Sequence, residues 1–377
     1  MKKLSYFILP VFFFGFIYFM FFNQIFQWKT FKTDTENREL SKFPSMNVNK
    51  LDDYPSQFDT YLNDNFTFRP PFLNAYHSYK FNMGISPNIQ DVIVGRNGHL
   101  FLAQKDQGIY EGKFDFNKTK LDSLLNIWQI RNEYFKSKNL DYYLLIAPNK
   151  HHVYPEYLPI GYREKNKNRT LIFKDFFEQQ FPSKLIYSLN ALLENKEYAY
   201  FKHDNHWTNK GGFVAYKQFL ELIRKNDKSI KSLSEKDFQW KETTSNGGNL
   251  LNFIGKHGEL TETFYQANFP KSEAKKGKGF NFKPTPGFPY PWDYEIHYTN
   301  EKALNKKKVL IIRDSFGEFI IPFFNETFSE TLYIFDGWKY GVNKEIIESY
   351  NPDIILFLTL ESFIDNVLEH PPIIDKE

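Results

Sequence analysis

The stretch Val309-Leu310-Ile311-Ile312-Arg313-Asp314-Ser315-Phe316-Gly317 is the part of the sequence that most clearly indicates the fold. Its continuous aliphatic start is typical of a strand that is buried on both faces, as in a parallel sheet. Ser315 follows where the chain turns from that strand toward a helix. In α/β proteins this junction lies at the carboxyl edge of the sheet, where functional groups gather. The stretch therefore predicts an α/β fold with an exposed serine.

The sequence around this stretch alternates between strand and helix patterns. Apolar runs at 142–147 and 354–358 predict two more buried strands. Apolar residues at helical spacing predict helices over 118–138, 171–181 and 211–225. Strands separated by helices imply a mainly parallel central sheet.

Two segments depart from this rhythm. Residues 92–101 read as two short strands around an Asn-Gly turn, which is a hairpin signal. The stretch 240–298 is rich in Gly, Pro, Asn and Lys, and it predicts a long insertion over one edge of the sheet.

The N-terminal segment 4–22 contains no charged residue and predicts a transmembrane helix of roughly 29 Å. Lys2 and Lys3 precede it, so we expect the N-terminus inside and everything after about Lys29 outside. A cleaved signal peptide is the alternative, but no A-x-A pattern of small residues follows the apolar run. We expect an uncleaved anchor over 1–28.

Three parts follow from these patterns. After the anchor, 29–85 forms a stalk and packing arm, in which 51–83 is expected to pack as helix on the main domain. The catalytic domain then spans 86–377, with the insertion at about 240–298.

Composition excludes several classes of protein. The net charge is only +3 and no basic stripe is present, so nucleic acid is not an expected partner. The chain has no cysteine, which removes disulfides, thiol nucleophiles, lipoprotein anchoring and cysteine-zinc sites.

A second segment supplies the partners that Ser315 needs. A serine hydroxyl is a weak nucleophile until a base takes its proton, and His206 has the ordinary pKa for that task. Asp204, two residues earlier, can orient the imidazole if 204–206 forms a tight turn. Each piece alone has an ordinary structural explanation, a helix cap for the serine and an Asx turn for the aspartate. Together they indicate a serine triad.

A metal site is the competing interpretation of the same segment. His203, Asp204 and His206 are suitable zinc ligands, but the chain has no HExxH motif. His151 and His152 are adjacent and would point apart on a strand. We therefore expect neither a metal nor a cofactor.

An ordered set of motifs resembles the SGNH hydrolase-like family of alginate O-acetylation proteins that includes AlgJ, AlgX and the DHHW proteins. The matching segments are 36–44, 64–69, 94–101, 147–156, 204–208 and 314–316. The resemblance implies a three-layer sandwich in which Ser315 is the nucleophile, His206 the base and Asp204 its orienter. It also implies O-acetylation or deacetylation of an extracellular, alginate-like polysaccharide.

The sequence departs from the family pattern at two places. Arg313 replaces the glycine before Asp-Ser, which alters the turn or adds a charge near the substrate. Asn249-Leu250 stands where Gly-Asp-Leu is usual.

Further candidates surround the triad. The first oxyanion donor is expected to be the backbone N–H of Ser315 or of Phe316, helped by Asn149 or Lys150 after the 142–147 strand. The remaining substrate candidates are Arg313, Trp207 and Tyr154. Of these, Trp207 is either core or a wall on which a sugar stacks, and the core interpretation is favoured.

Transfer and hydrolysis share an acyl-serine intermediate and differ only in the acceptor. Outside the membrane, a transferase needs an acyl donor handed across the bilayer, for which a membrane-bound O-acyltransferase (MBOAT-type) partner is expected. A permanent anchor in the inner membrane would hold the enzyme beside such a partner, with its catalytic domain in the periplasm or extracytoplasmic space. The sequence therefore favours a polysaccharide O-acetyltransferase over an acetylesterase or a catalytically silent glycan-binding scaffold.

Overall fold

A computed structural model describes residues 2–31, 40–46, 48–83, 88–89, 91–103, 105–164, 167–284 and 288–375. Of the predicted motifs, the beginning of the segment 36–44 lies outside the described residues.

A seven-stranded sheet in the order β5-β4-β12-β10-β11-β9-β8 forms the centre of the main domain. The strands are β4 (Asp141–Ala147), β5 (Leu185–Tyr187), β8 (Lys275–Lys276), β9 (Glu295–Thr299), β10 (Asn305–Arg313), β11 (Phe328–Phe335) and β12 (Ile354–Leu360). From β5 to β11 neighbouring strands are parallel, which confirms the predicted class. The strands predicted at 142–147, 309–312 and 354–358 all lie within it.

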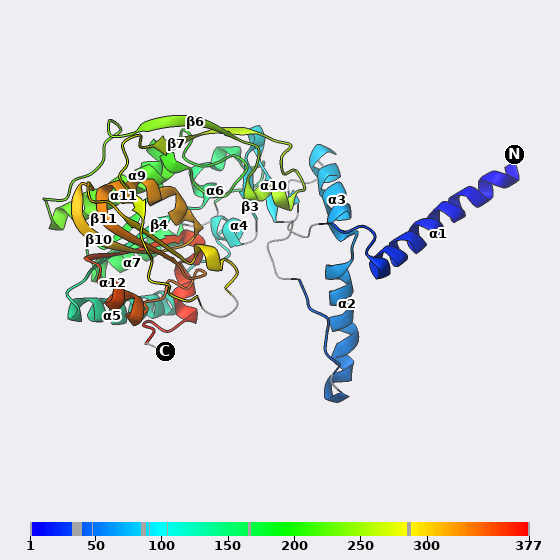
Figure 1. Ribbon diagram of the computed structural model, residues 1–377, viewed down its shortest axis with the longest axis horizontal. Helices are drawn as coiled ribbons and strands as arrows, with labels where there is room; N and C mark the ends of the chain where they lie inside the picture. Colours follow the sequence, from blue (N-terminus) through cyan, green and yellow to red (C-terminus); the bar gives the residue numbers. More distant parts are fainter. Residues whose placement is uncertain are drawn as a thin grey trace.

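Helices cover both faces of this sheet, so the fold is an α/β sandwich (Figure 1). On one face lie α5 (Lys118–Ser137) and α12 (Lys344–Tyr350), and on the other α9 (Asn209–Asn226) and α11 (Ile321–Thr327). The α7 helix (Arg169–Gln180) packs beside α5 and β5. The three helices predicted at 118–138, 171–181 and 211–225 are confirmed as α5, α7 and α9. The shorter helical segments are α4 (Lys105–Tyr110), α6 (Lys150–Val153), η3 (Pro155–Tyr157), α8 (Leu189–Glu194), α10 (Asn249–Phe253), η4 (Pro291–Asp293), η5 (Ser315–Ile320) and η6 (Glu361–Glu369).

Aromatic side chains join the layers. Trp128 of α5 meets Phe357 of β12 edge to face, with ring centroids 5.1 Å apart. On the opposite face, Phe219 of α9 packs against Tyr143 of β4. The parallel register aligns Arg313 with Leu358, and Leu360 with Ala147, so the strands end at one common edge.

The insertion at 240–298 differs from the prediction. It begins with a hairpin of β6 (Gln239–Ser245) and β7 (Glu262–Asn268). It then supplies β8 and β9, which join the central sheet because β9 pairs antiparallel with β11. The insertion therefore extends the sheet as well as covering its edge.

A small three-stranded sheet confirms the hairpin predicted at 92–101. It consists of β1 (Asn88–Ile89), β2 (Val92–Val94) and β3 (Leu100–Leu102), with η2 (Arg96–Gly98) at the turn. Asn97 and Gly98 have φ angles of 54° and 79°. These left-handed conformations suit Asn and Gly, which is why the dipeptide stands there.

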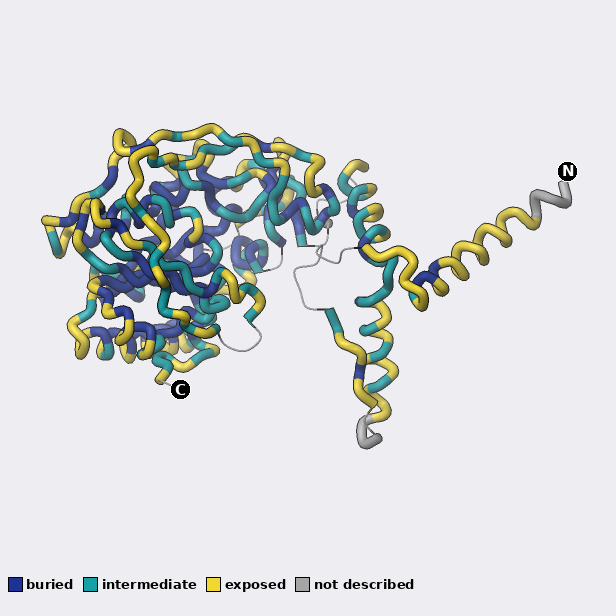
Figure 2. Tube along the Cα trace, in the orientation of Figure 1, coloured by how far each residue is buried: buried dark blue, intermediate teal, exposed yellow. Residues whose placement is uncertain are grey.

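The N-terminal part is helical and lies beside the main domain. It contains α1 (Lys2–Phe26), η1 (Val48–Asp53), α2 (Tyr54–Asn65) and α3 (Arg69–Met83). Figure 1 shows α1 projecting away from the domain, and Figure 2 shows it exposed along nearly its whole length. Residues 7–26 are long and apolar enough to cross a membrane, a property that signal sequences share.

Part of the segment 51–83 packs on the main domain. Helix α3 contacts it: Asn74 lies against Gly255, and Phe81 packs on the cluster around Leu250. Helix α2 stands apart from the domain (Figure 1).

Candidate active site

Ser315 lies where β10 passes into η5, and the buried Asp314 before it holds this turn in place. Oδ1 of Asp314 accepts a hydrogen bond from the N–H of Phe316 at 2.9 Å. Its Oδ2 accepts from the hydroxyl of Tyr340 at 2.9 Å and from the N–H of Leu360 at 2.6 Å. Because Leu360 ends β12, one carboxylate ties the serine turn to the neighbouring strand.

The geometry of the same turn explains why residue 317 is a glycine and where the side chain of Arg313 lies. A Cβ at position 317 would lie 2.4 Å from Cδ of Arg313, whose side chain folds beneath the turn. Arg313 is buried, and its guanidinium donates to Oδ1 of Asp293 at 2.7 Å and to the carbonyl of Asp314 at 3.2 Å. Its charge is therefore paired with Asp293, and its side chain lies under the serine turn.

The loop 203–206 brings a carboxylate and an imidazole to Ser315. Oδ1 of Asp204 accepts from the backbone N–H of His206 at 3.0 Å and lies 2.6 Å from its Nδ1. This is the tight turn that the two-residue spacing requires. On the other side of the ring, Nε2 of His206 lies 2.7 Å from Oγ of Ser315. The three side chains thus form one continuous hydrogen-bonded series.

Charge and burial shift the pKa values of His206 and Asp204 in opposite directions. Burial disfavours the charged imidazole of His206, but the charge and the hydrogen bond of Asp204 outweigh it and raise the histidine pKa above its ordinary value of 6.5. Burial likewise disfavours ionised Asp204, yet His206 and two backbone N–H donors lower its pKa to about 2. The His206 and Asp204 side chains remain 16% and 18% exposed, so the series is reachable from outside.

The carboxylate is also held from a segment that sequence reasoning did not assign to the site. The N–H of Asn249 donates to Oδ2 of Asp204 at 2.9 Å. Gly248 permits this approach, since a Cβ there would lie 2.4 Å from the carbonyl oxygen of His203. The only signal in the sequence was the departure from the family pattern at Asn249-Leu250.

Lys150 and Glu262 hold the two sides of the 202–206 loop. Nζ of Lys150 donates to the carbonyl oxygens of Leu100 at 2.7 Å, Lys202 at 2.8 Å and Asp204 at 3.1 Å. An ammonium group has three donors, so Lys150 has none left for an oxyanion. Burial lowers the pKa of Lys150 to about 7.

Glu262 binds the same loop from its N–H side. Its carboxylate accepts from the N–H of Lys202 at 2.5 Å and of His203 at 3.0 Å. Burial raises the pKa of Glu262. Nothing in the sequence around Glu262 distinguished it from other insertion residues.

Trp207 and Tyr154 are core residues. Trp207 is fully buried, and its Nε1 donates to the carbonyl of Phe316 at 2.8 Å, which links the histidine loop to the serine turn. Tyr154 is buried, with its hydroxyl donating to the carbonyl of Lys196 and accepting from the N–H of Tyr200. Neither side chain is available to line a substrate cleft.

The other predicted oxyanion donors differ in whether another acceptor already binds them. The N–H of Phe316 is taken by Asp314. Within the described part of the chain, the N–H of Ser315 has no acceptor, and neither has Nδ2 of the buried Asn149. Oδ1 of Asn149 accepts from Ser362, which orients the amide.

The histidines considered as metal ligands have other surroundings in the structure. Nδ1 of His203 faces Glu262 at 3.6 Å. His151 and His152 lie in the short helix α6 rather than on a strand, and His152 contacts Glu361 at 2.5 Å. Among the residues with described coordinates, no three ligand-type side chains cluster as a metal site would need.

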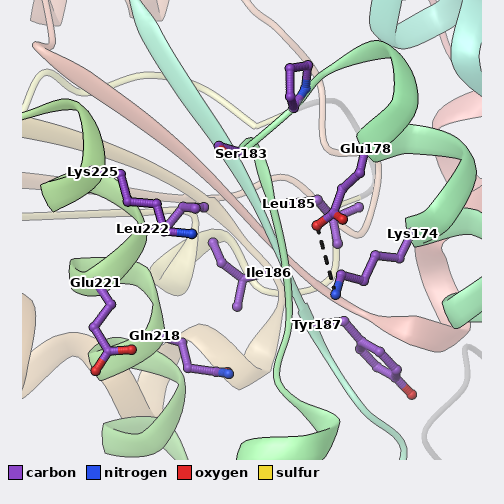
Figure 3. A pocket seen from close by; sticks show the side chains of 11 residues that line it. Lys174, Glu178, Ser183, Leu185, Ile186, Tyr187, Gln218, Glu221, Leu222 and Lys225 are labelled. Carbon is purple, nitrogen blue, oxygen red and sulfur yellow. Dashed lines mark ion pairs between the residues drawn. The ribbon is translucent and has the colours of Figure 1, made fainter.

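A groove of about 470 Å³ lies elsewhere, along the open edge of β5 between α7 and α9 (Figure 3). Lys174 and Glu178 form an ion pair of 3.8 Å on one wall. No triad residue lines this groove.

Residues 92–279 match the sequence profile described as the SGNH hydrolase-like domain of the acetyltransferase AlgX. The matched range contains Asp204 and His206 but ends before Ser315, so the assignment of the nucleophile depends on the geometry above. A comparison with curated protein sequences finds no match.

One solved structure shares the fold at low sequence identity, and two others are also similar to this chain. PatB1 from Bacillus cereus aligns with a TM-score of 0.52 and 16% identity over 72% of this chain and 96% of its own. A DHHW family protein from Eubacterium siraeum gives 0.47 and 19% over 73% and 91%. The O-acetyltransferase domain of Pseudomonas putida AlgJ gives 0.46 and 14% over 73% and 92%.

Proposed function

We propose that this protein is a membrane-anchored, extracytoplasmic O-acetyltransferase, since residues 92–279 match the SGNH hydrolase-like domain of the acetyltransferase AlgX. It acts on an exported polysaccharide through an acyl-Ser315 intermediate. The observation that carries the proposal is the hydrogen-bonded series from Ser315 through His206 to Asp204, with distances of 2.7 Å and 2.6 Å.

The first half-reaction forms the intermediate. Oγ of Ser315 attacks the carbonyl carbon of the acyl donor while Nε2 of His206 takes the hydroxyl proton. Asp204 keeps the imidazole in the required tautomer and stabilises its charged form. The tetrahedral intermediate collapses, the donor oxygen leaves with the proton from His206, and the acetyl group stays on Ser315.

The second half-reaction reverses these roles. His206 takes the proton of a sugar hydroxyl, whose oxygen attacks the acetyl carbonyl, and the proton returns to Oγ of Ser315 as the ester transfers. The negative oxygen in both steps needs fixed donors. We assign this task to the N–H of Ser315 and to Nδ2 of Asn149, since both are free of other acceptors among the described residues.

The N-terminal helix supports transfer over hydrolysis. Residues 7–26 suit a retained anchor, and an anchor raises the effective concentration of the enzyme beside an MBOAT-type acyl donor in the inner membrane. The Asn23 and Gln24 side chains bond to residues after the apolar stretch, including Lys29 and Thr67, which favours retention over cleavage.

The test uses the full chain in detergent with a labelled acetyl ester, with and without an oligosaccharide acceptor. Label on the sugar supports the transferase, whereas acetate release that is insensitive to sugar identifies an esterase. The Ser315→Ala variant should lose both activities. If it transfers acetyl groups as well as the wild type does, the acyl-serine proposal is wrong.

A further inference from the structure

Helix α3 has two opposite faces: one packs on the main domain, and the other meets α1 at its start and carries exposed side chains along the rest. The domain-facing side includes Asn74 and Phe81, which contact Gly255 and the Leu250 cluster. The other side carries four large side chains at helical spacing that are all exposed. These are Phe72 (44%), Tyr76 (54%), Tyr79 (56%) and Met83 (61%). At 100° per residue these four positions fall within a stripe about 60° wide. We call this set the α3 stripe.

The start of α3 is fastened to α1. Phe68, just before α3, packs on Phe19 of α1 with ring centroids 5.8 Å apart, and Phe72 lies 6.3 Å from Phe16. Oε1 of Gln24 accepts from the N–H of Thr67 at 2.8 Å and from its hydroxyl at 2.7 Å. The α3 stripe is therefore continuous with the apolar surface of α1.

The place where Phe68 contacts α1 indicates how deep the start of α3 lies in the membrane. Phe19 lies seven residues before Phe26, the end of the candidate span, which corresponds to about 10 Å along the helix. Amphipathic helices at a bilayer surface bury their apolar face by roughly 5–10 Å. The α2–α3 turn is thus fastened to α1 at interfacial depth.

The composition of α3 fits a lipid surface. The helix contains two basic residues, Arg69 and Lys80, and no acidic residue. Nζ of Lys80 lies 5.0 Å above the ring of Tyr76, beside the stripe. Aromatic side chains combined with basic ones are the set that membrane interfaces select, particularly where headgroups are anionic.

We propose that α3 lies at the extracytoplasmic surface of the membrane that α1 spans, with the α3 stripe inserted among lipid headgroups and upper acyl chains. The proposal rests on the retained anchor of the proposed function. It assigns the stripe to a lipid surface and not to a protein partner.

The placement has a consequence for the active site. The domain-facing side of α3 packs through Phe81 on the cluster that contains Leu250, and Asn249, the residue before Leu250, donates its N–H to Asp204. A helix lying on the bilayer would therefore hold the catalytic residues close to the membrane, where an acyl donor embedded in the bilayer can reach them.

The chain has no cysteine, so single nitroxide labels can be placed without ambiguity. The full protein is reconstituted in nanodiscs of phosphatidylcholine with phosphatidylglycerol and carries one label, at Tyr76→Cys or Tyr79→Cys. Ser123→Cys, on the exposed surface of α5, is the matched control. Collision of each label with oxygen, which concentrates in lipid, and with a polar nickel chelate, which lipid excludes, is then measured.

We expect the nickel collision rate at the stripe to fall roughly tenfold below the control while the oxygen rate rises, because a polar chelate is excluded from the acyl region. A nickel rate equal to the control would place the stripe in water. Low rates for both reagents would mean that a protein covers the stripe. Either result overturns the proposal.

Two further measurements separate this inference from the proposed function. The Ser315→Ala protein should give the same label pattern, since the serine plays no part in docking. The intact mass of the purified protein reports whether α1 is retained. A retained α1 together with a water-exposed stripe would reject only the role of α3.

Discussion

At the residue scale, the hydrogen bonds of His206 would govern both activity and pH dependence in the proposed mechanism. As the base, the imidazole must be neutral to accept the proton of Ser315, but Asp204 raises its pKa above 6.5. The same shift contributes to stability: this contribution is fully present below pH 6.5 and is lost as the pH rises through the raised pKa. Activity is therefore gained over the pH range in which the His206 contribution to stability is lost.

We expect kcat/KM for acyl transfer to rise with pH, with an apparent pKa above 6.5 that belongs to the His206–Asp204 pair. Steady-state rates with a soluble acetyl ester between pH 5 and 9 measure it. A rate that is flat across this range would contradict His206 as the base.

Replacing Asp204 with Asn should lower kcat by roughly 10³–10⁴, since the amide favours the wrong tautomer of the imidazole. The apparent pKa should also fall, because the charge that raises it is gone. Asp122→Asn, on the exposed face of α5, is the control and should leave both quantities unchanged. An active Asp204→Asn enzyme would remove this residue from the triad.

At the scale of elements, the loop 202–206 has little regular structure and is held by side chains from elsewhere. Lys150, after β4, binds its carbonyl groups, while Glu262, at the start of β7, binds its N–H groups. The geometry of His206 thus depends on two elements that lie far from it in the sequence.

Lys150→Met should lower the free energy of unfolding by roughly 3 kcal/mol, about 1 kcal/mol for each of the three carbonyl groups left unpaired. It should also reduce kcat, because the loop that carries Asp204 and His206 loses its support. Chemical denaturation and acyl-transfer rates measure the two effects. Lys136→Met on the exposed face of α5 is the matched control, and equal effects in both variants would contradict the role of Lys150.

Gly248→Ala tests how α10 approaches the loop. The new methyl group would meet the backbone carbonyl of His203 at 2.4 Å, so the contact from Asn249 to Asp204 must shift, and we expect a lower kcat. Gly247→Ala is the control, because its methyl group would meet only the His257 ring at 3.2 Å, and a side chain can move. Equal rates for the two variants would show that α10 does not position Asp204.

At the scale of the whole molecule, the proposed function has α1 hold the chemistry at the membrane. We expect the full chain to stay in the membrane fraction after an alkaline carbonate wash and to keep its N-terminal peptide in mass spectra. Release of a form that begins after Phe26 would identify α1 as a signal sequence instead.

Much of this architecture was predictable from local pattern. The apolar runs in β4, β10 and β12 identified buried strands, because a strand with both faces covered must be apolar throughout. Helices α5, α7 and α9 followed from their spacing. The role of α3 could not be predicted in this way, because its two faces are both partly apolar. Only the arrangement of the chain distinguishes the covered face from the exposed one.

The candidate nucleophile, its two partners and the apolar helix were recognisable in the sequence, because a strand end, a two-residue spacing and an uncharged run are local features. The roles of the surrounding residues became clear only from the tertiary structure. Lys150 proved to hold a loop, Arg313 to be a buried residue paired with Asp293, and Tyr154 to lie in the core. The physical reason is that the partner of a buried polar group comes from another part of the chain, and its position is set by packing rather than by neighbouring residues.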